Sequence, residues 1–379
     1  MLYSYIKESF NQITIKIDES YWTEEKSAYY GESKTIYKKN KVDTIVIKQE
    51  NTDNRLSLSD YNFNYLRYFQ NYFRNAKTTF QIIKKEKEIF SPYKTTNKKE
   101  EYIEIIKIED NRNGFLVKAD YSFEPDKINY KKLQEDFLRV KDRDKRSKKI
   151  VSGEYDLFFR KKAAGILIHE IIGHLLEADI SLKSDTPFKK DKLNKKVLPE
   201  HITIYDDILP TDTIDDEGIK MEPVILIDRG VLKNFISDYN YYLAGFGSSG
   251  RGKRENFRVP PLPRQNIISL TEGNKTEDEI ISEIQNGILI DDINSGELNY
   301  STLETTMFVK ESFLIKNGKK SHPLKSFSIK MGVSDIIAKI GNISDTVYIG
   351  GWEGGCRKNG QLIRNGYKIP SFVISKIKF

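Results

Sequence analysis

Residues 161–179 constrain the fold of this chain more than any other segment. They read KKAAGILIHEIIGHLLEAD, an apolar stretch of helical length that carries His169, Glu170 and His174. The chain has only four histidines, so two of them close together beside a glutamate form a distinctive group. In zinc hydrolases, neutral imidazoles bind the metal and a carboxylate takes a proton from water, whose pKa the metal lowers from about 15.7 to about 7. The segment therefore predicts a helix with a zinc site.

The spacing of the two histidines is unusual for such a helix. In the familiar H-E-x-x-H pattern the rings are four residues apart and lie within about 40° of each other around the helix axis. His169 and His174 are five residues apart, and a regular α-helix would separate them by about 140°, too far to share one ion. We therefore predict a π-turn within residues 168–175, where Gly173 would tolerate a distorted backbone. The alternative, two unrelated histidines on a buried helix, would leave Glu170 unpaired beside an apolar face, which is costly.

The third metal ligand is not fixed by this spacing. A catalytic zinc ion normally has three protein ligands and one open position. The remaining candidates are Glu177, Asp179, His201, His322 and Cys356. Glycines and basic residues flank Cys356, as expected for an accessible thiolate, but a lone cysteine is more often a small buried hydrophobic residue. The residues alone leave both interpretations of Cys356 open.

Composition limits the class of protein. The net charge is 62 − 55 = +7, and the basic residues are dispersed along the chain, which argues against nucleic-acid binding. A single cysteine excludes an intramolecular disulfide. The longest clean apolar run, residues 163–168, is far shorter than the roughly 20 residues of a membrane span. We expect a soluble, cytoplasmic protein that binds neither nucleic acid nor membranes.

The length of 379 residues favours two domains. We predict that residues 1–148 form a smaller N-terminal α+β domain. Residues 13–17 and 44–48 alternate apolar with polar side chains, as half-buried strands do, and residues 115–119 are typical of another strand. A mostly aromatic stripe in the same region predicts a helix packed on a sheet. Its residues are Tyr65, Leu66, Phe69, Tyr72 and Phe73.

A change in composition marks the expected domain boundary. Residues 141–149 read KDRDKRSKK and continue the amphipathic pattern of Leu133, Phe137 and Val140. Two aspartates interrupt this basic run, which makes a nucleic-acid patch the weaker interpretation. We interpret it as the solvated end of a helix that leads out of the first domain.

We predict that residues 149–379 form a large β-rich catalytic domain, so the expected fold class is α+β, with mixed sheets and a helix that carries the zinc motif. Residues 228–230 (DRG) are typical of a hairpin turn, residues 248–263 of a long loop, and residues 275–285 of a short helix. Strands are expected at residues 151–159, 201–205, 223–228 and 231–237. Three arginines of the long loop have two equally weighted roles, stabilisation of an oxyanion or a place in solvent or at a dimer contact: Arg251, Arg254 and Arg258.

Several motifs in this part of the chain occur in the order found in one protein family. They are SGEYD (152–156), AAGILIHEIIGHLLEAD (163–179), DDEG (215–218), ILIDRGVLKNFISD (225–238), SSGRGKRENFRVPPLPR (248–264), ESFLIKNGK (311–319) and CRKNGQ (356–361). With them the chain resembles the TldD/PmbA zinc metallopeptidases over most of residues 150–379. The resemblance has two departures: the family's P-R-M-T-N is replaced by PRQNI at residues 263–267, and the N-terminal module is shorter than usual.

The resemblance implies a role for each motif residue. In this family the two histidines of H-E-x-x-x-H and a C-terminal cysteine bind zinc, and the glutamate is catalytic. These roles carry over to His169, His174 and Cys356 as ligands and to Glu170 as the catalytic residue. The presence of the zinc motif makes the chain similar to the catalytic, TldD-like members.

The resemblance also implies a substrate and a partner. Family members cleave unfolded or extended peptides within an enclosed dimer cavity, often in the maturation of peptide natural products. We therefore expect a zinc-dependent peptidase that forms a homodimer or a heterodimer with a homologous subunit, with Glu177 and Asp179 behind the metal ligands. No pattern identifies the substrate-binding residues. The alternative is a non-catalytic, zinc-containing partner subunit of a heteromeric peptidase complex.

Overall fold

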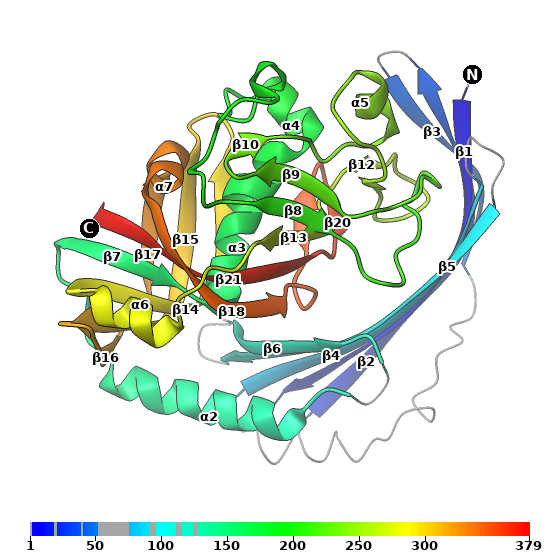
Figure 1. The fold of residues 1–379 in the computed structure, drawn as a ribbon. Helices are drawn as coiled ribbons and strands as arrows, with labels where there is room; N and C mark the ends of the chain where they lie inside the picture. The colour runs from blue at the N-terminus through cyan, green and yellow to red at the C-terminus, as the bar shows by residue number, and fades with distance from the viewer. Residues whose placement is uncertain are drawn as a thin grey trace.

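Two large β-sheets and a few helices make up the fold (Figure 1). The computed structural model describes residues 2–18, 21–38, 41–51, 76–90, 96–110, 116–124 and 127–379. The predicted α+β class with mixed sheets is confirmed, because the larger sheet contains both parallel and antiparallel strand pairs. The predicted aromatic helix at residues 65–73 lies outside the described residues. The division into domains at residue 148 stays a prediction.

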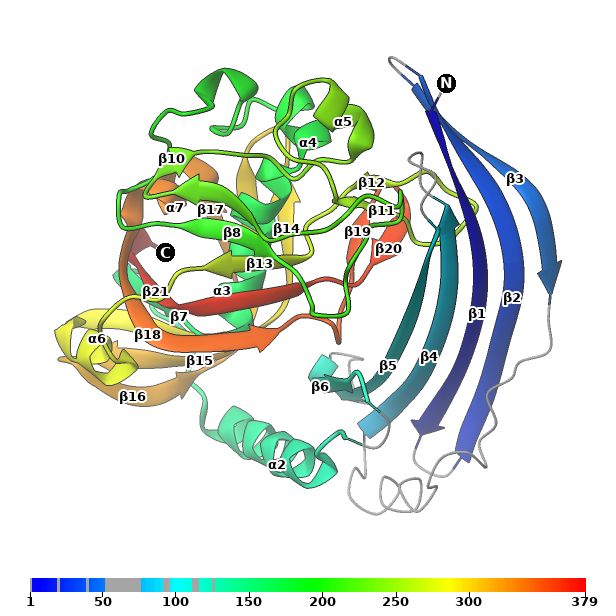
Figure 2. The same ribbon diagram turned by 45° about the vertical axis from the view of Figure 1, so that its right-hand side comes forward.

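The six-stranded sheet is antiparallel and has the strand order β3-β2-β1-β4-β5-β6. It forms a curved wall beside the rest of the molecule (Figure 2). The strands predicted at residues 13–17 and 44–48 lie within β1 and β3, and the one at 115–119 overlaps β6. The strands are β1 Leu2–Asp18, β2 Tyr21–Lys38, β3 Lys41–Asn51, β4 Ala76–Phe90, β5 Thr96–Asp110 and β6 Leu116–Ser122.

Helix α2, Tyr130–Arg146, packs on this sheet. Its apolar stripe of Leu133, Phe137 and Val140 is buried against sheet residues that include Ile82. The stripe was predicted and is confirmed, because side chains three and four residues apart share one helix face. Most of the charged run at residues 141–149 belongs to the last turns of α2, as expected.

The larger sheet has eleven strands. Nine follow the order β10-β9-β8-β13-β21-β7-β14-β15-β16, while β17 pairs with β15 and β18 with β21. In β7, Leu157 and Phe159 pack with helix α3 and Phe158 packs with helix α6, so both faces of this strand are covered. The predicted strands at 151–159 and 201–205 correspond to β7 and β8, which begin at residues 154 and 204.

The remaining elements have the following bounds. The strands of the larger sheet are β7 Glu154–Phe159, β8 Ile204–Asp207, β9 Val224–Asp228, β10 Val231–Leu232, β13 Ile267–Leu270, β14 Asn286–Asn299, β15 Glu304–Lys316, β16 Lys319–Leu324, β17 Phe327–Gly332, β18 Ile340–Gly350 and β21 Gly366–Lys378. Two short hairpins are β11 Gly252–Lys253 with β12 Leu262–Pro263, and β19 Cys356–Lys358 with β20 Gln361–Ile363. The helices are α3 Lys161–Ile168, α4 Ala178–Lys183, α5 Tyr239–Leu243, α6 Glu277–Glu283 and α7 Val333–Lys339.

The strand predicted at residues 231–237 is wrong beyond Leu232, where β10 ends. The hairpin turn before it is present, because the backbone at residues 229 and 230 has positive φ angles of 45° and 78°. After Leu232 the chain leaves the sheet and bonds to another element. The amide of Ile236 donates to the carbonyl of Leu176 at 2.9 Å, and the amide of Ala178 donates to Ile236 at 3.0 Å.

The predicted long loop at residues 248–263 lies between the two sheets in space, as its short strands β11 and β12 show (Figure 2). Arg251 and Arg254 are each only 1% exposed, so their predicted place in solvent or at a dimer contact is wrong. Arg254 instead donates to Oγ1 of Thr35 in β2 at 3.0 Å. Phe257 packs where Gly31 has no side chain: a Cβ at Gly31 would lie 1.9 Å from the ring.

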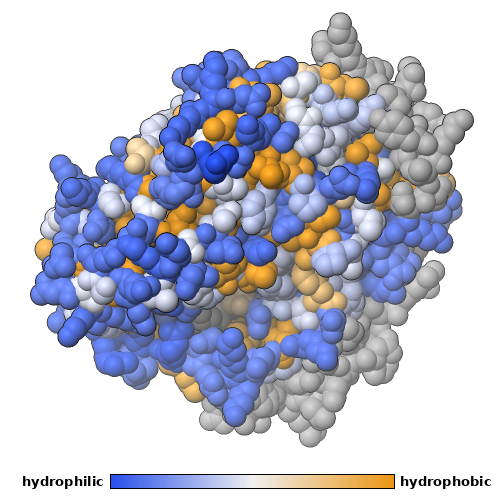
Figure 3. Space-filling view, in the orientation of Figure 1, coloured by the Kyte–Doolittle hydropathy of each residue, from blue (hydrophilic) through white to orange (hydrophobic). Residues whose placement is uncertain are grey.

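The surface is polar over most of the face seen in Figure 3, and apolar residues emerge mainly in its middle. In the part of the chain that the structure describes, no helix has the length and apolar character needed to cross a bilayer.

Candidate metal centre

The helix that carries the predicted motif changes its geometry inside the motif. α3 is regular up to Ile168, and His169–Gly173 then forms a π-helical turn. The amide of His174 accordingly donates to the carbonyl of His169, five residues earlier. The predicted π-turn is confirmed.

The same helix was expected to continue to residue 179, and this is wrong. A 3₁₀ turn ends at Leu176, Glu177 has an extended backbone with ψ of 124°, and α4 begins at Ala178. The helix breaks because the backbone groups on either side of Glu177 are bonded to Ile236, as described above, and not to a further helical turn.

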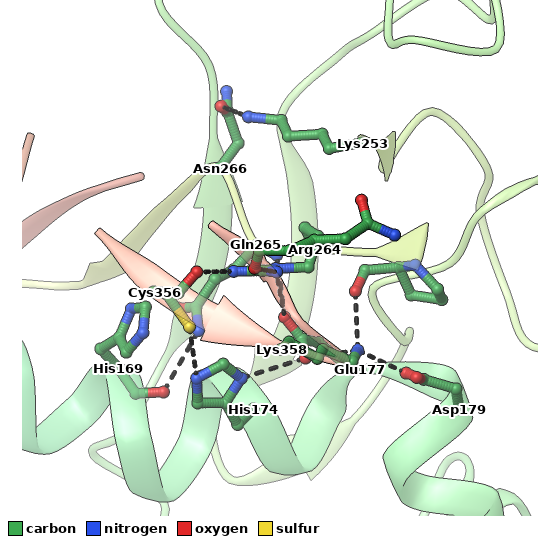
Figure 4. A network of polar contacts seen from close by, with 12 residues as sticks. His169, His174, Glu177, Asp179, Lys253, Arg264, Gln265, Asn266, Cys356 and Lys358 are labelled. Atoms are coloured by element: carbon green, nitrogen blue, oxygen red, sulfur yellow. Dashed lines mark hydrogen bonds and ion pairs between the residues drawn. The ribbon is translucent and has the colours of Figure 1, made fainter. Parts of the chain in front are cut away.

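The side chains of His169, His174 and Cys356 converge at the π-turn (Figure 4). Their potential ligand atoms all lie within 4.8 Å of one another, and Sγ of Cys356 is 3.0 Å from Nε2 of His174. The two imidazole centroids are 4.7 Å apart. Among the described residues, this is the only group of three or more His, Cys, Asp or Glu side chains close enough to hold a metal ion. His201 and His322 lie outside it.

Cys356 begins β19, in a hairpin whose turn uses positive φ angles at Asn359 and Gly360. Burial acts to raise the pKa of the thiol, but His174 and His169 outweigh it and lower the pKa to about 5. The thiolate is the form of cysteine that binds metals. The hairpin therefore brings a thiolate, a potential metal ligand, to the two imidazoles.

Glu170 lies in the π-turn beside this donor group without belonging to it. Burial raises the pKa of its carboxyl, although His174 and His169 act to lower it. Strand β14 packs closely there, since a Cβ at Gly296 would lie 3.1 Å from Cγ of Glu170. A carboxyl group with a raised pKa suits proton transfer near neutral pH.

Gln265 packs against the π-turn from the segment that follows β12 (Figure 4). Its Nε2 donates to the carbonyl of His169 at 3.3 Å, the same oxygen that accepts from the amide of His174. The side chain fits because residue 173 is glycine: a Cβ at Gly173 would lie 2.1 Å from Oε1 of Gln265. The sequence predicts that Gly173 tolerates a distorted backbone, but no sequence pattern indicates that Gln265 contacts it.

A buried ion network supports His174 from behind (Figure 4). Glu177 accepts from Nδ1 of His174 at 3.0 Å, and Nζ of Lys358 donates to Glu177 at 2.7 Å and to Asp179 at 2.6 Å. Burial acts to raise the pKa of Glu177, but Lys358, His174 and Arg264 together outweigh it and the pKa is lowered. A charged carboxylate on Nδ1 directs Nε2 toward the thiol, as the outer partners of metal-bound histidines do. Sequence reasoning placed Glu177 and Asp179 here but missed Lys358.

This donor set fits a metal ion. Two imidazole nitrogens and a thiolate sulfur are ligands that zinc prefers, and the carboxylate behind His174 supplies the outer support that such sites use. The candidates Glu177 and Asp179 lie behind the group and are engaged with Lys358. The assignment of ligand and catalytic roles to individual residues stays a prediction.

Comparison with known proteins decides the family. Residues 152–379, more than half of the chain, match the model of the PmbA/TldA metallopeptidase C-terminal domain. The chain belongs to the PmbA/TldD metallopeptidase family. The resemblance stated from the sequence motifs is thereby confirmed.

Named relatives of this PmbA/TldD-family chain agree. It is 30% identical over 283 residues to the "metalloprotease TldD homolog" of Buchnera aphidicola subsp. Acyrthosiphon pisum, covering 72% of this chain and 58% of the relative. It is 29% identical over 238 residues to the "zinc metalloprotease TldD homolog" of Saccharolobus solfataricus, covering 60% and 52%. The matched part thus spans a little over half the length of these relatives.

The fold agrees over the whole chain. The crystal structure of TldE from Thermococcus kodakarensis superposes with a TM-score of 0.74 at 16% identity, covering 99% of this chain and 96% of that one. At this identity the likeness establishes the fold alone.

Proposed function

We propose that this chain is a zinc-dependent peptidase in which His169, His174 and Cys356 hold the metal and Glu170 is the general base. The observation that carries the proposal is the convergence of the three donor atoms within 4.8 Å at the π-turn that also bears Glu170. Membership of a metallopeptidase family and a relative named as a zinc metalloprotease support it.

Each residue of the centre has a task in this reaction. When bound, zinc supplies Lewis-acid chemistry: it makes water more acidic and polarises a carbonyl group. Glu170 accepts a proton from the attacking water and later passes it to the nitrogen of the departing amine. Glu177 fixes the orientation of the His174 ring through Nδ1, and Lys358 keeps Glu177 ionised.

The test combines metal analysis with peptide digestion. Wild-type protein is expected to contain zinc and to cleave an unfolded polypeptide until a chelator is added. Glu170→Gln should keep the zinc and lose turnover, whereas Glu200→Gln, at an exposed glutamate, should retain both. Activity retained in Glu170→Gln refutes the base. A wild-type protein that holds zinc but cleaves nothing supports the alternative, a non-catalytic zinc-containing subunit.

We propose further that the substrates are unfolded or extended peptides, including precursors of peptide natural products. The basis is membership of the family, because no described residue identifies a sequence preference. An extended peptide has free backbone groups that can pair with a strand, whereas a folded protein has already paired them. One polypeptide in native and in unfolded form should therefore be cleaved only when unfolded. Equal cleavage of both forms contradicts this substrate class.

A further inference from the structure

The hairpin of β14 and β15 borders the metal centre and places a tyrosine beside it. Strand β14 passes Glu170 at Gly296, as described above. Four residues later, in the turn after β14, the ring of Tyr300 meets the ring of His174 edge-on, with centroids 6.4 Å apart and an interplanar angle of 86°. The phenol therefore lies at the border of the centre that holds the base.

The turn fixes the backbone that carries this tyrosine. Oδ1 of Asn299 accepts from the amides of Ser301 at 2.9 Å and Thr302 at 3.1 Å, and its carbonyl accepts from Leu303 at 2.8 Å. These bonds lie on both sides of Tyr300. Its ring is therefore presented by a defined turn.

The phenol is accessible and uncommitted. Tyr300 is 38% exposed, and within the described part of the chain its hydroxyl has no hydrogen-bond partner. At neutral pH a tyrosine hydroxyl is protonated and can donate a hydrogen bond. Tyr300 can thus donate a hydrogen bond to a group that enters the site.

The two cations that contact Glu177, namely Lys358 and Arg264, do not offer such a donor. Nζ of Lys358 already has three acceptors, which are Glu177, Asp179 and the carbonyl of Pro263. Arg264 is fully buried and donates to the carbonyl of Cys356 at 2.6 Å.

We propose that Tyr300 is a catalytic residue that donates a hydrogen bond to the carbonyl oxygen of the scissile peptide bond as that oxygen becomes negatively charged. This inference rests on the proposed peptidase function and adds the electrostatic stabiliser that amide hydrolysis requires. Water oxygen bonds to the carbonyl carbon, the π pair moves to the carbonyl oxygen, and the water proton goes to Glu170. When the C–N bond breaks, that proton passes to the amine. Tyr300 keeps its own proton throughout.

The test replaces the hydroxyl and keeps the ring. Tyr300→Phe should lower kcat about 100-fold with KM near the wild-type value, because such a donor acts mainly in the transition state. Its affinity for a phosphinic peptide, which mimics the tetrahedral intermediate, should fall by a similar factor in calorimetry. Zinc content and thermal stability should not change. Tyr242→Phe, at an exposed tyrosine of α5, serves as the matched control and should behave as wild type.

Several outcomes overturn the inference. Wild-type kcat and phosphinic-peptide affinity in Tyr300→Phe show that the hydroxyl has no part in catalysis. A rise in KM alone assigns it to substrate binding, and a loss of zinc or of folding assigns it to structure. A wild-type protein that neither cleaves peptides nor binds the phosphinic peptide overturns the peptidase proposal and this inference together, whereas an active wild type with an equally active Tyr300→Phe overturns this inference alone.

Discussion

Two opposing effects act on the charge of the Cys356 thiol. Burial favours the neutral thiol, but the imidazoles beside it favour the thiolate, and the result is a pKa of about 5. The partner whose Nε2 lies at 3.0 Å, His174, is 182 positions away in the chain. A lone cysteine with glycine neighbours therefore becomes a thiolate, the form of cysteine that can bind a metal, only through the tertiary fold.

Removal of this thiol should abolish tight zinc binding. Cys356→Ala leaves two imidazoles, fewer ligands than a catalytic zinc site normally has. We expect a severe loss of zinc in metal analysis, while circular dichroism shows a folded chain. His322→Ala, at a histidine outside the donor group, is the control and should keep its zinc. Full zinc occupancy in Cys356→Ala contradicts the ligand assignment.

At the scale of an element, the π-turn depends on a close fit between the side chain of Gln265 and the backbone at Gly173. The amide of Gln265 reaches the carbonyl of His169 only because Gly173 leaves space for it. The turn is therefore stabilised from outside the helix as well as by its own hydrogen bond.

A methyl group at position 173 should disturb this fit. Gly173→Ala places Cβ on the side chain of Gln265, and overpacking of this kind typically costs about 1–3 kcal/mol of unfolding free energy. The double variant Gly173→Ala/Gln265→Ala removes the clash, so it should be less destabilised than the sum of the single variants. Urea denaturation of all four proteins measures the coupling. Additive effects would show that the two residues do not interact.

Helix α5 offers a pH-dependent test at the same scale. Its cap Asp238 accepts from the amide of Tyr241 at 2.9 Å, and burial, with the charges of Asp179 and Asp215, raises its pKa to about 7. Between about pH 4 and pH 7 the folded protein therefore binds more protons than the unfolded chain, and this carboxyl makes stability fall as pH rises.

Replacement of this carboxyl should remove its part of the pH dependence. Asp238→Asn keeps a cap acceptor but cannot ionise, so its stability relative to wild type should increase from pH 4 to pH 7 in thermal unfolding. Asp345→Asn, at an exposed aspartate, should show no such trend. A constant difference between Asp238→Asn and wild type over this range contradicts the raised pKa.

The elements that could be predicted from sequence are those with local causes. The spacing of His169 and His174 required a π-turn, and the stripe of α2 required one buried face. The helix break at Glu177 could not be predicted, because a backbone segment near residue 236 causes it. The same holds for Lys358, whose carboxylate partners are about 180 positions away.

At the scale of the whole molecule, buried and largely buried ion pairs join the six-stranded sheet to the segment between β8 and β9. Lys87 of β4 lies 2.6 Å from Asp216, and Lys99 of β5 lies 2.9 Å from Asp212. Buried charges of this kind need their partners, because a charge left unpaired in the interior is strongly destabilising. The six-stranded sheet is thus fixed to the segment that carries the DDEG motif, whose partners no local pattern reveals.

The outer edge of the six-stranded sheet is the feature that we connect with assembly. Edge strand β3 exposes Ile45, Val46 and Ile47 by 51%, 42% and 56%. Exposed apolar edge strands tend to pair with other chains. We propose that this edge contributes to a dimer with a second copy or with a homologous subunit.

A charge on this edge tests the proposal. The protein alone is expected to be a dimer in light scattering, or to become one on addition of a homologous subunit. Val46→Lys should shift the mass toward the monomer, since lysine on an edge strand opposes pairing. Ile349→Lys, at an exposed residue of β18, should leave the dimer intact. A dimer that is unaffected by Val46→Lys shows that β3 is not its interface.

The π-turn also affects how the length of this chain can change over generations. It is equivalent to one inserted codon that the helix absorbs without breaking. Loss of Ile172 would leave HEIGH, whose two rings lie within about 40° of each other on a regular α-helix, so the later residues would keep nearly the same direction. His174 could then still face Cys356 and Glu177. The number of residues between the two histidines is therefore less constrained than the identities of His169, Glu170 and His174.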